Sequence, residues 1–147
     1  MKSNLVTTYL PETFSSDSQN ILLGEWCRPY GSNSKLFSNS KYIKYHWDDF
    51  AKLEKDYEYL YEIYYKSIKQ ISKKLNEFHK LDKPTKFWQI IVGPWLANQL
   101  SMFWDRWENI RVVFENEKID FTKCLKYSDV DLVPSDYKES AFLVNNH

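Results

Sequence analysis

The chain has 147 residues, equal numbers of acidic and basic side chains, and an aromatic content of 18%. This length fits one domain, and the zero formal charge gives no reason to expect a nucleic-acid partner, which would need a basic surface. No apolar run approaches the ~20 residues of a transmembrane segment, and the N-terminus lacks the apolar stretch of a signal peptide. We therefore predict a cytoplasmic protein. Its two cysteines, Cys27 and Cys124, have no zinc-type spacing and are expected to be reduced thiols.

The first 45 residues predict short strands separated by polar loops. β-Prone or apolar segments lie at 5–9, 21–23 and 41–45. Glu25 and Arg28 directly follow the second of these segments. Because open α/β sheets place ligands just past their buried strands, this charged and aromatic stretch is a candidate site.

Residues 46–115 predict two long helices. In the first, apolar side chains recur every three or four positions from Phe50 to Phe78, and charged side chains cover the opposite face. Asp48 or Asp49 is expected to cap its N-terminus by accepting hydrogen bonds from free backbone amides.

The second helix is predicted over about 86–115, after a break at 81–85. Pro94 follows Gly93 inside it, and proline removes a helical hydrogen bond, so we expect a kink or a break there. Two long helices joined by a short turn form an antiparallel hairpin.

The C-terminal part, 116–147, is polar, with a possible short strand at 122–127. A third helix is expected to begin at Pro134 and to be cut off at His147. An apolar helix face with nothing following it suggests a truncated product or the N-terminal piece of a longer protein.

These elements predict an α-rich α/β fold: two or three short N-terminal strands, then a long antiparallel helical hairpin kinked at Gly93-Pro94. We interpret it as an incomplete Rossmann-like N-terminal domain. The whole chain, 1–147, is taken as one domain with three regions. These regions are the strand and loop region 1–45, the helical hairpin 46–115, and the final region 116–147.

Glu25 and Arg28 each have two possible roles. A carboxylate beside Trp26 can act as a general base, or Glu25 can simply form a salt bridge with Arg28. The Arg28 guanidinium can hold a phosphate or carboxylate through two parallel hydrogen bonds.

His46, Trp47 and Asp48 combine a histidine, an aromatic ring and an acid at a helix start. They are either site residues or an ordinary helix cap. We predict no metal site, since no second histidine has ligand spacing.

Trp95 is either part of the core at the kink or a platform that stacks on a sugar ring or base. Asp105 and Arg106 are expected to form an ion pair between Trp104 and Trp107, either buried or at a cleft. The chain has no P-loop, GxGxxG or GxSxG motif, so we predict no cofactor bound to this chain alone.

Several motifs resemble the N-terminal part of a family of bacterial transferases associated with surface polysaccharide and O-antigen biosynthesis. The most distinctive are Gly24-Glu25-Trp26-Cys27, His46-Trp47-Asp48 and Gly93-Pro94-Trp95. Members of that family are longer than this chain, and their further region is glycosyltransferase-like.

The resemblance implies sugar transfer from a nucleotide-sugar donor to a glycan or lipid-linked acceptor. By analogy with two-domain glycosyltransferases, this chain would hold the acceptor, and a missing C-terminal domain would hold the donor. The isolated chain is then expected to be inactive.

We assign catalysis to Glu25 and His46, and substrate binding to Arg28, Trp47, Asp48, Trp95, Asp105 and Arg106. The alternative is a non-enzymatic helical module that docks a partner through a tyrosine stripe. Convergence of Glu25, His46 and Trp95 on one cleft would favour the enzyme. The tyrosines of the alternative are Tyr57, Tyr61 and Tyr64.

Overall fold

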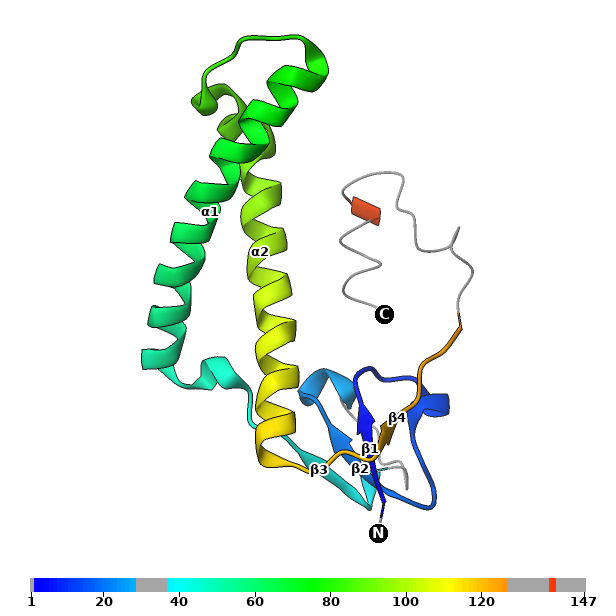
Figure 1. Cartoon of the computed structure of the whole chain (residues 1–147). Helices are drawn as coiled ribbons and strands as arrows, with labels where there is room; N and C mark the ends of the chain where they lie inside the picture. The colour runs from blue at the N-terminus through cyan, green and yellow to red at the C-terminus, as the bar shows by residue number, and fades with distance from the viewer. Residues whose placement is uncertain (1, 29–36, 127–137, 140–147) are drawn as a thin grey trace. The chain divides into compact units, whose positions relative to one another are not determined.

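The computed structural model describes residues 2–28, 37–126 and 138–139 (Figure 1). The chain forms two compact units. The sheet unit comprises Met1–Lys44 and Val113–His147, and the helical unit comprises Tyr45–Val112. Within the described ranges, no helix has the length and apolar content needed to cross a membrane.

The sheet unit contains four parallel strands in the order β3-β2-β1-β4. Central strands β1 and β2 pair in register, with Leu5 opposite Ile21 and Val6 opposite Leu22. Together with the helices, this sheet confirms an α/β fold. The strands are β1 (Ser3–Val6), β2 (Gln19–Leu22), β3 (Ser40–Tyr42) and β4 (Phe121–Thr122).

Apolar side chains of β1 and β2 make the core of this unit. Parallel strands are usually covered on both faces and therefore have nearly continuous apolar runs rather than alternating ones. Val113, near the end of the second long helix, is also fully buried in this core. The buried core residues are Leu5, Val6, Phe14, Ile21, Leu22, Leu23, Cys27 and Val113.

Two buried asparagines join β1 to β2 and to the loop between them. The Asn4 side-chain amide donates to Asn20 Oδ1 at 2.9 Å and to the Thr13 carbonyl at 2.9 Å. Asn20 also bonds the backbone N–H and carbonyl of Ser15, both at 2.9 Å. This loop, which includes the short helix η1 (Pro11–Thr13), is thus tied to the strands without a long helix.

Helix α1 (Phe50–His79) is the first of the two long helices of the helical unit, and it matches the predicted helix closely. The predicted cap is Asp49, whose carboxylate accepts from the backbone N–H groups of Ala51 and Lys52. The helix ends at Lys80, which adopts the left-handed conformation (φ 54°) and stops the helical hydrogen bonding.

Helix α2 (Thr85–Asn116) follows after four residues, 81–84. Asn76 organises this connection: its side chain bonds both the N–H and the carbonyl of Lys83 and accepts from the Trp88 indole at 2.8 Å. Helix α2 continues through Pro94 without interruption, so the predicted disturbance at Gly93-Pro94 does not break the helix.

Shorter predictions differ in their limits. The first strand, Ser3–Val6, starts and ends earlier than the predicted 5–9. The last strand is only Phe121–Thr122, so it shares one residue with the predicted 122–127 segment. The helix predicted from Pro134 lies outside the described residues, apart from the helical positions 138–139.

Candidate functional site

Glu25 lies at the carboxyl end of β2, as the sequence predicted. It begins the short helix η2 (Glu25–Cys27), three residues after the strand ends, and its side chain is exposed. Its neighbour Trp26 donates from its indole N–H to the Thr7 carbonyl at 3.0 Å. The Trp26 ring covers Gly24 so closely that a Cβ there would lie 2.1 Å from a ring atom. A side chain at position 24 would therefore displace the Trp26 ring from this position.

Arg28 ends the same segment and is also exposed. Its guanidinium lies over the rings of Phe37 and Tyr42, 5.7 and 6.0 Å from their centroids. Both contacts are within the usual range of a cation–π interaction, so they orient the guanidinium while leaving it accessible.

His46 lies in the helical unit, on the short helix η4 (His46–Asp48), with a side chain only 1% exposed. Its Nε2 is 3.0 Å from Asp105 Oδ1 on α2. The same oxygen accepts from the Tyr45 hydroxyl at 2.7 Å and from the Asn109 amide at 3.1 Å. Because this carboxylate oxygen accepts from Tyr45 and Asn109, we assign the ring proton of His46 to Nε2, which then donates to the same oxygen.

The second ring nitrogen of His46, Nδ1, is buried and has no hydrogen-bond partner among the described residues. It faces Asp56 Oδ2 on α1 at 3.7 Å, which is too long for a hydrogen bond. Because Nε2 carries the proton, Nδ1 presents a lone pair inside the structure.

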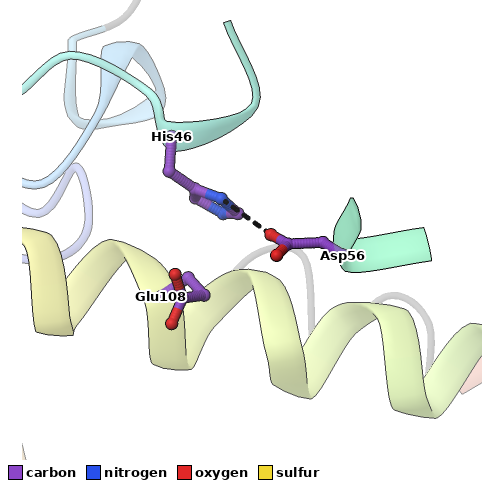
Figure 2. Close-up of side chains that lie close together, drawn as sticks. All are labelled: His46, Asp56 and Glu108. Carbon is purple, nitrogen blue, oxygen red and sulfur yellow. Dashed lines mark ion pairs between the residues drawn. The ribbon is translucent and has the colours of Figure 1, made fainter. Parts of the chain in front are cut away.

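Lys52 joins the two remaining acids of this region. Its ammonium is 2.6 Å from Asp56 Oδ2 and 2.7 Å from Glu108 Oε2. We call His46, Lys52, Asp56, Asp105 and Glu108 the His46 cluster. Figure 2 shows three of its members, His46 from η4, Asp56 from α1 and Glu108 from α2, facing one another.

The groups around the cluster hold two of its acids, Asp56 and Glu108, ionised. Burial alone would raise the pKa of Asp56, but hydrogen bonds from Lys52 and from nearby indoles outweigh it and lower that pKa. Trp47 Nε1 donates to Asp56 Oδ2 at 2.9 Å. The indole N–H of Trp104 is close enough to favour the ionised carboxylate, although its geometry falls short of a hydrogen bond.

Arg111 lowers the pKa of Glu108 by donating hydrogen bonds to its carboxylate. Its guanidinium donates to both carboxylate oxygens at 2.8 and 2.9 Å, and with Lys52 it lowers the pKa of Glu108 to about 2 against the effect of burial. Burial would lower the pKa of Lys52, but its two acids raise it. Burial and Asp105 raise the pKa of Tyr45, which stays neutral. Asp56 and Glu108 are therefore ionised, and Lys52 is charged, near neutral pH.

A nitrogen and two carboxylates in one place are also potential metal ligands. One ligand atom each from His46, Asp56 and Glu108 lies within 4.8 Å of the other two. A substrate cannot reach the His46 imidazole in this structure, because the side chain is only 1% exposed. The predicted role of His46 in catalysis would need direct access to the substrate.

The other predicted site residues are spread over the helical unit. Trp47 is half-buried between the rings of His46 and Tyr57, at 4.8 and 5.8 Å. Asp48 and Arg106 are exposed. Trp95 is 46% exposed and ten residues from Asp105, which is about 15 Å along a helix axis. Trp95 therefore does not line the His46 cluster.

The predicted tyrosine stripe borders an apolar hollow of about 270 Å³ in the helical unit. Tyr57 and Tyr61 are more than half exposed, and Tyr64 is half-buried with its hydroxyl against Gly93. The hollow is lined by Tyr57, Leu60, Tyr61, Tyr64, Ala97, Leu100 and Ser101.

The sequence did not predict a site role for three members of the His46 cluster, Lys52, Asp56 and Glu108, or for Asn109, which donates to Asp105. A signal was present. Asp56 stands within the apolar stripe of the first helix, three residues after Leu53 and four before Leu60. Glu108 and Asn109 follow Asp105 at helical spacing in an otherwise aromatic segment.

A family model described as "LIC12162 family transferase" matches residues 3–147 of the chain. No curated protein matches it, and no solved structure matches it.

Proposed function

The chain belongs to the LIC12162 family of transferases, and we propose that it is the acceptor-side portion of a glycosyltransferase-like enzyme. The reaction would add a sugar to a bacterial surface polysaccharide such as O-antigen. The observation that carries this proposal is the position of Glu25, exposed just past the carboxyl end of a buried parallel strand.

The sheet supports a Rossmann-like interpretation. Its parallel order β3-β2-β1-β4 has the same pattern as the first four strands of a doubly wound nucleotide-binding sheet. Contacts between the two long helices support the antiparallel hairpin. Residues near the end of α1 contact residues near the start of α2, and residues near the start of α1 contact residues near the end of α2. These contacts are Asn76 with Trp88, Tyr64 with Gly93, Tyr59 with Trp104 and Lys52 with Glu108.

In the proposed reaction, the Glu25 carboxylate takes the proton of an acceptor hydroxyl. The hydroxyl oxygen forms a bond to the anomeric carbon of the donor sugar as the bond from that carbon to the donor phosphate breaks. Arg28 contacts a phosphate of the acceptor or the departing nucleotide. Trp95, which is 46% exposed, remains a predicted sugar-stacking residue of the helical unit.

We propose that the nucleotide-sugar donor binds to a second domain, by analogy with two-domain glycosyltransferases. Among the predicted residues, His46 and Asp105 then act by holding η4, α1 and α2 together rather than by touching the acceptor, because the imidazole is buried.

The test is to delete the gene in the source bacterium and to analyse its surface polysaccharide by gel and by sugar composition. We expect the deletion to remove or shorten the polysaccharide. Wild-type protein should restore it, whereas Glu25→Gln should not, because the amide cannot take a proton. A matched control is Glu12→Gln, which changes another exposed glutamate of the sheet unit and should restore the wild-type pattern. An unchanged polysaccharide in the deletion strain would exclude this function.

The alternative, a helical interaction module, is favoured by the hollow beside Tyr57 and Tyr61. In that case, Tyr61→Ser would abolish capture of a partner, while Glu25→Gln would have no effect on the cellular phenotype.

A further inference from the structure

We propose that His46, Asp56 and Glu108 form a binding site for one divalent transition-metal ion, zinc or manganese. Their ligand atoms, one imidazole nitrogen and two carboxylate oxygens, lie within 4.8 Å of one another (Figure 2). A set of one nitrogen and two oxygen ligands suits both of these ions. The three side chains come from η4, α1 and α2, so a bound ion would connect all three elements.

The first observation is the unpartnered nitrogen of His46. Nδ1 is buried, has no hydrogen-bond partner among the described residues, and points its lone pair at Asp56 Oδ2, 3.7 Å away. A buried acceptor facing another acceptor is unfavourable. A cation between the two atoms would turn this repulsion into two coordinate bonds.

The second observation is that each potential ligand already has an outer partner. Histidines that bind metals usually donate their other N–H to a carboxylate, and ligating carboxylates are themselves hydrogen-bonded. All three side chains follow this pattern. The outer partners are Asp105 for His46, Trp47 for Asp56 and Arg111 for Glu108.

The third observation is that a cation already bridges the two carboxylates. The Lys52 ammonium lies 2.6 Å from Asp56 and 2.7 Å from Glu108. Its side chain is 25% exposed on a flexible four-carbon stem, so it can turn outward without disturbing the helices.

Charge favours the exchange. Three carboxylates, on Asp56, Asp105 and Glu108, face the two cations Lys52 and Arg111, which leaves one negative charge when the imidazole is neutral. A divalent ion in place of the ammonium removes this excess. Binding would therefore displace Lys52 and fix the start of α1 to α2.

The test uses the whole chain, freed of metal with a chelator and titrated separately with Zn²⁺ and Mn²⁺ by calorimetry. Bound metal is then measured by elemental analysis after dialysis. We expect one ion per chain. His46→Gln and Asp56→Asn should abolish binding, and Asp105→Asn should weaken it by about 10- to 100-fold. Lys52→Met should bind more tightly, because the competing ammonium is gone.

Two matched controls should bind like the wild type: His79→Gln, an exposed histidine at the end of α1, and Asp48→Asn, an exposed acid beside His46. In ¹⁵N NMR spectra, Zn²⁺ should shift the Nδ1 signal of His46 and leave that of His79 unchanged. This measurement on the wild-type chain decides the matter if a cluster variant fails to fold.

Three results would overturn the proposal. The first is that neither ion binds to the wild-type chain. The second is that binding persists unchanged in His46→Gln, which would indicate an adventitious ion only. The third is that only Lys52→Met binds metal, which would make the lysine the permanent cation of the cluster.

Discussion

Each buried polar side chain of this chain depends on a small number of specific atoms. The Asn4 amide is held by Asn20 and Thr13, and the His46 ring by Asp105. Removing one partner of such a pair costs about 1–3 kcal/mol, because the other group stays buried without a hydrogen bond. Among the described residues, His46 Nδ1 is one of four buried side-chain polar atoms without a hydrogen-bond partner; the others are Asn4 Oδ1, the Tyr42 hydroxyl and Trp104 Nε1.

The two cysteines should differ strongly in reactivity. Cys27 is fully buried, and its thiol donates to the Val6 carbonyl at 3.3 Å, whereas Cys124 is exposed. Burial raises the pKa of Cys27 from 9.0 to about 11. Since the thiolate is the reactive form, iodoacetamide at pH 8 should label Cys124 and spare Cys27 in the native protein, as mass spectrometry would show.

The same shift has a consequence for stability. Above pH 9 the Cys27 thiol ionises in the unfolded chain before it ionises in the folded one, so its contribution to stability is lost between pH 9 and pH 11. Cys27→Ser should remove this part of the alkaline loss of stability. Rapid labelling of native Cys27 at pH 8 would contradict both expectations.

The two long helices, as elements, differ in how their apolar residues are arranged. Helix α1 has one apolar stripe, which made its limits predictable. Helix α2 carries apolar side chains on several faces, and Ile91, Trp95, Phe103 and Trp107 are all about half exposed or more. An apolar pattern on several faces identifies a helix without identifying which face is buried.

Pro94 gives a prediction at this scale. It lies inside α2 without the backbone N–H that would bond to the Ile90 carbonyl, and proline in a helix interior is about 3 kcal/mol less favourable than alanine. Pro94 is exposed, so Pro94→Ala should restore a hydrogen bond to Ile90 and raise the free energy of unfolding in urea. Asn98→Ala, one turn further along, is the control and should change stability by less than about 0.7 kcal/mol. A loss of stability in Pro94→Ala would mean that the proline positions Gly93 against Tyr64.

At the scale of the whole molecule, the sheet unit joins segments from the two ends of the chain. Strand β4 pairs with β1, and the Asp120 carboxylate accepts from the Ser3 backbone N–H at 2.8 Å, across 117 positions. Thr122 donates its hydroxyl proton to the Leu5 carbonyl at 2.8 Å. The sheet unit therefore needs both the N-terminal segment and the residues after α2.

The stability of that unit should depend on its small core. Leu22 is fully buried in the core of the sheet unit, so Leu22→Ala should lower the free energy of unfolding by about 2–5 kcal/mol. Leu125→Ala, at a leucine that is 39% exposed, is the matched control and should cost far less. Both are measured by urea unfolding followed by circular dichroism. Equal effects of the two substitutions would contradict the assignment of the core.

Of the candidate site, the sequence predicted that Glu25 directly follows a buried strand and that His46 lies at the start of the first long helix. It did not predict Lys52, Asp56 or Glu108, since only the packing of α1 against α2 shows that these side chains meet. The roles assigned to Glu25, Arg28 and the tryptophans remain predictions.

The amino-acid sequence by itself determined the two long helices and the end of α1 near His79, because helices follow from local spacing and capping, and it limited the cap to Asp48 or Asp49, of which the structure uses Asp49. It also indicated the buried strands, whose apolar runs are local too. Only the tertiary structure decided that β4 lies beside β1 and that His46, Asp56 and Glu108 meet. These neighbours are far apart in the chain, and no local pattern records which distant residues will pack against each other.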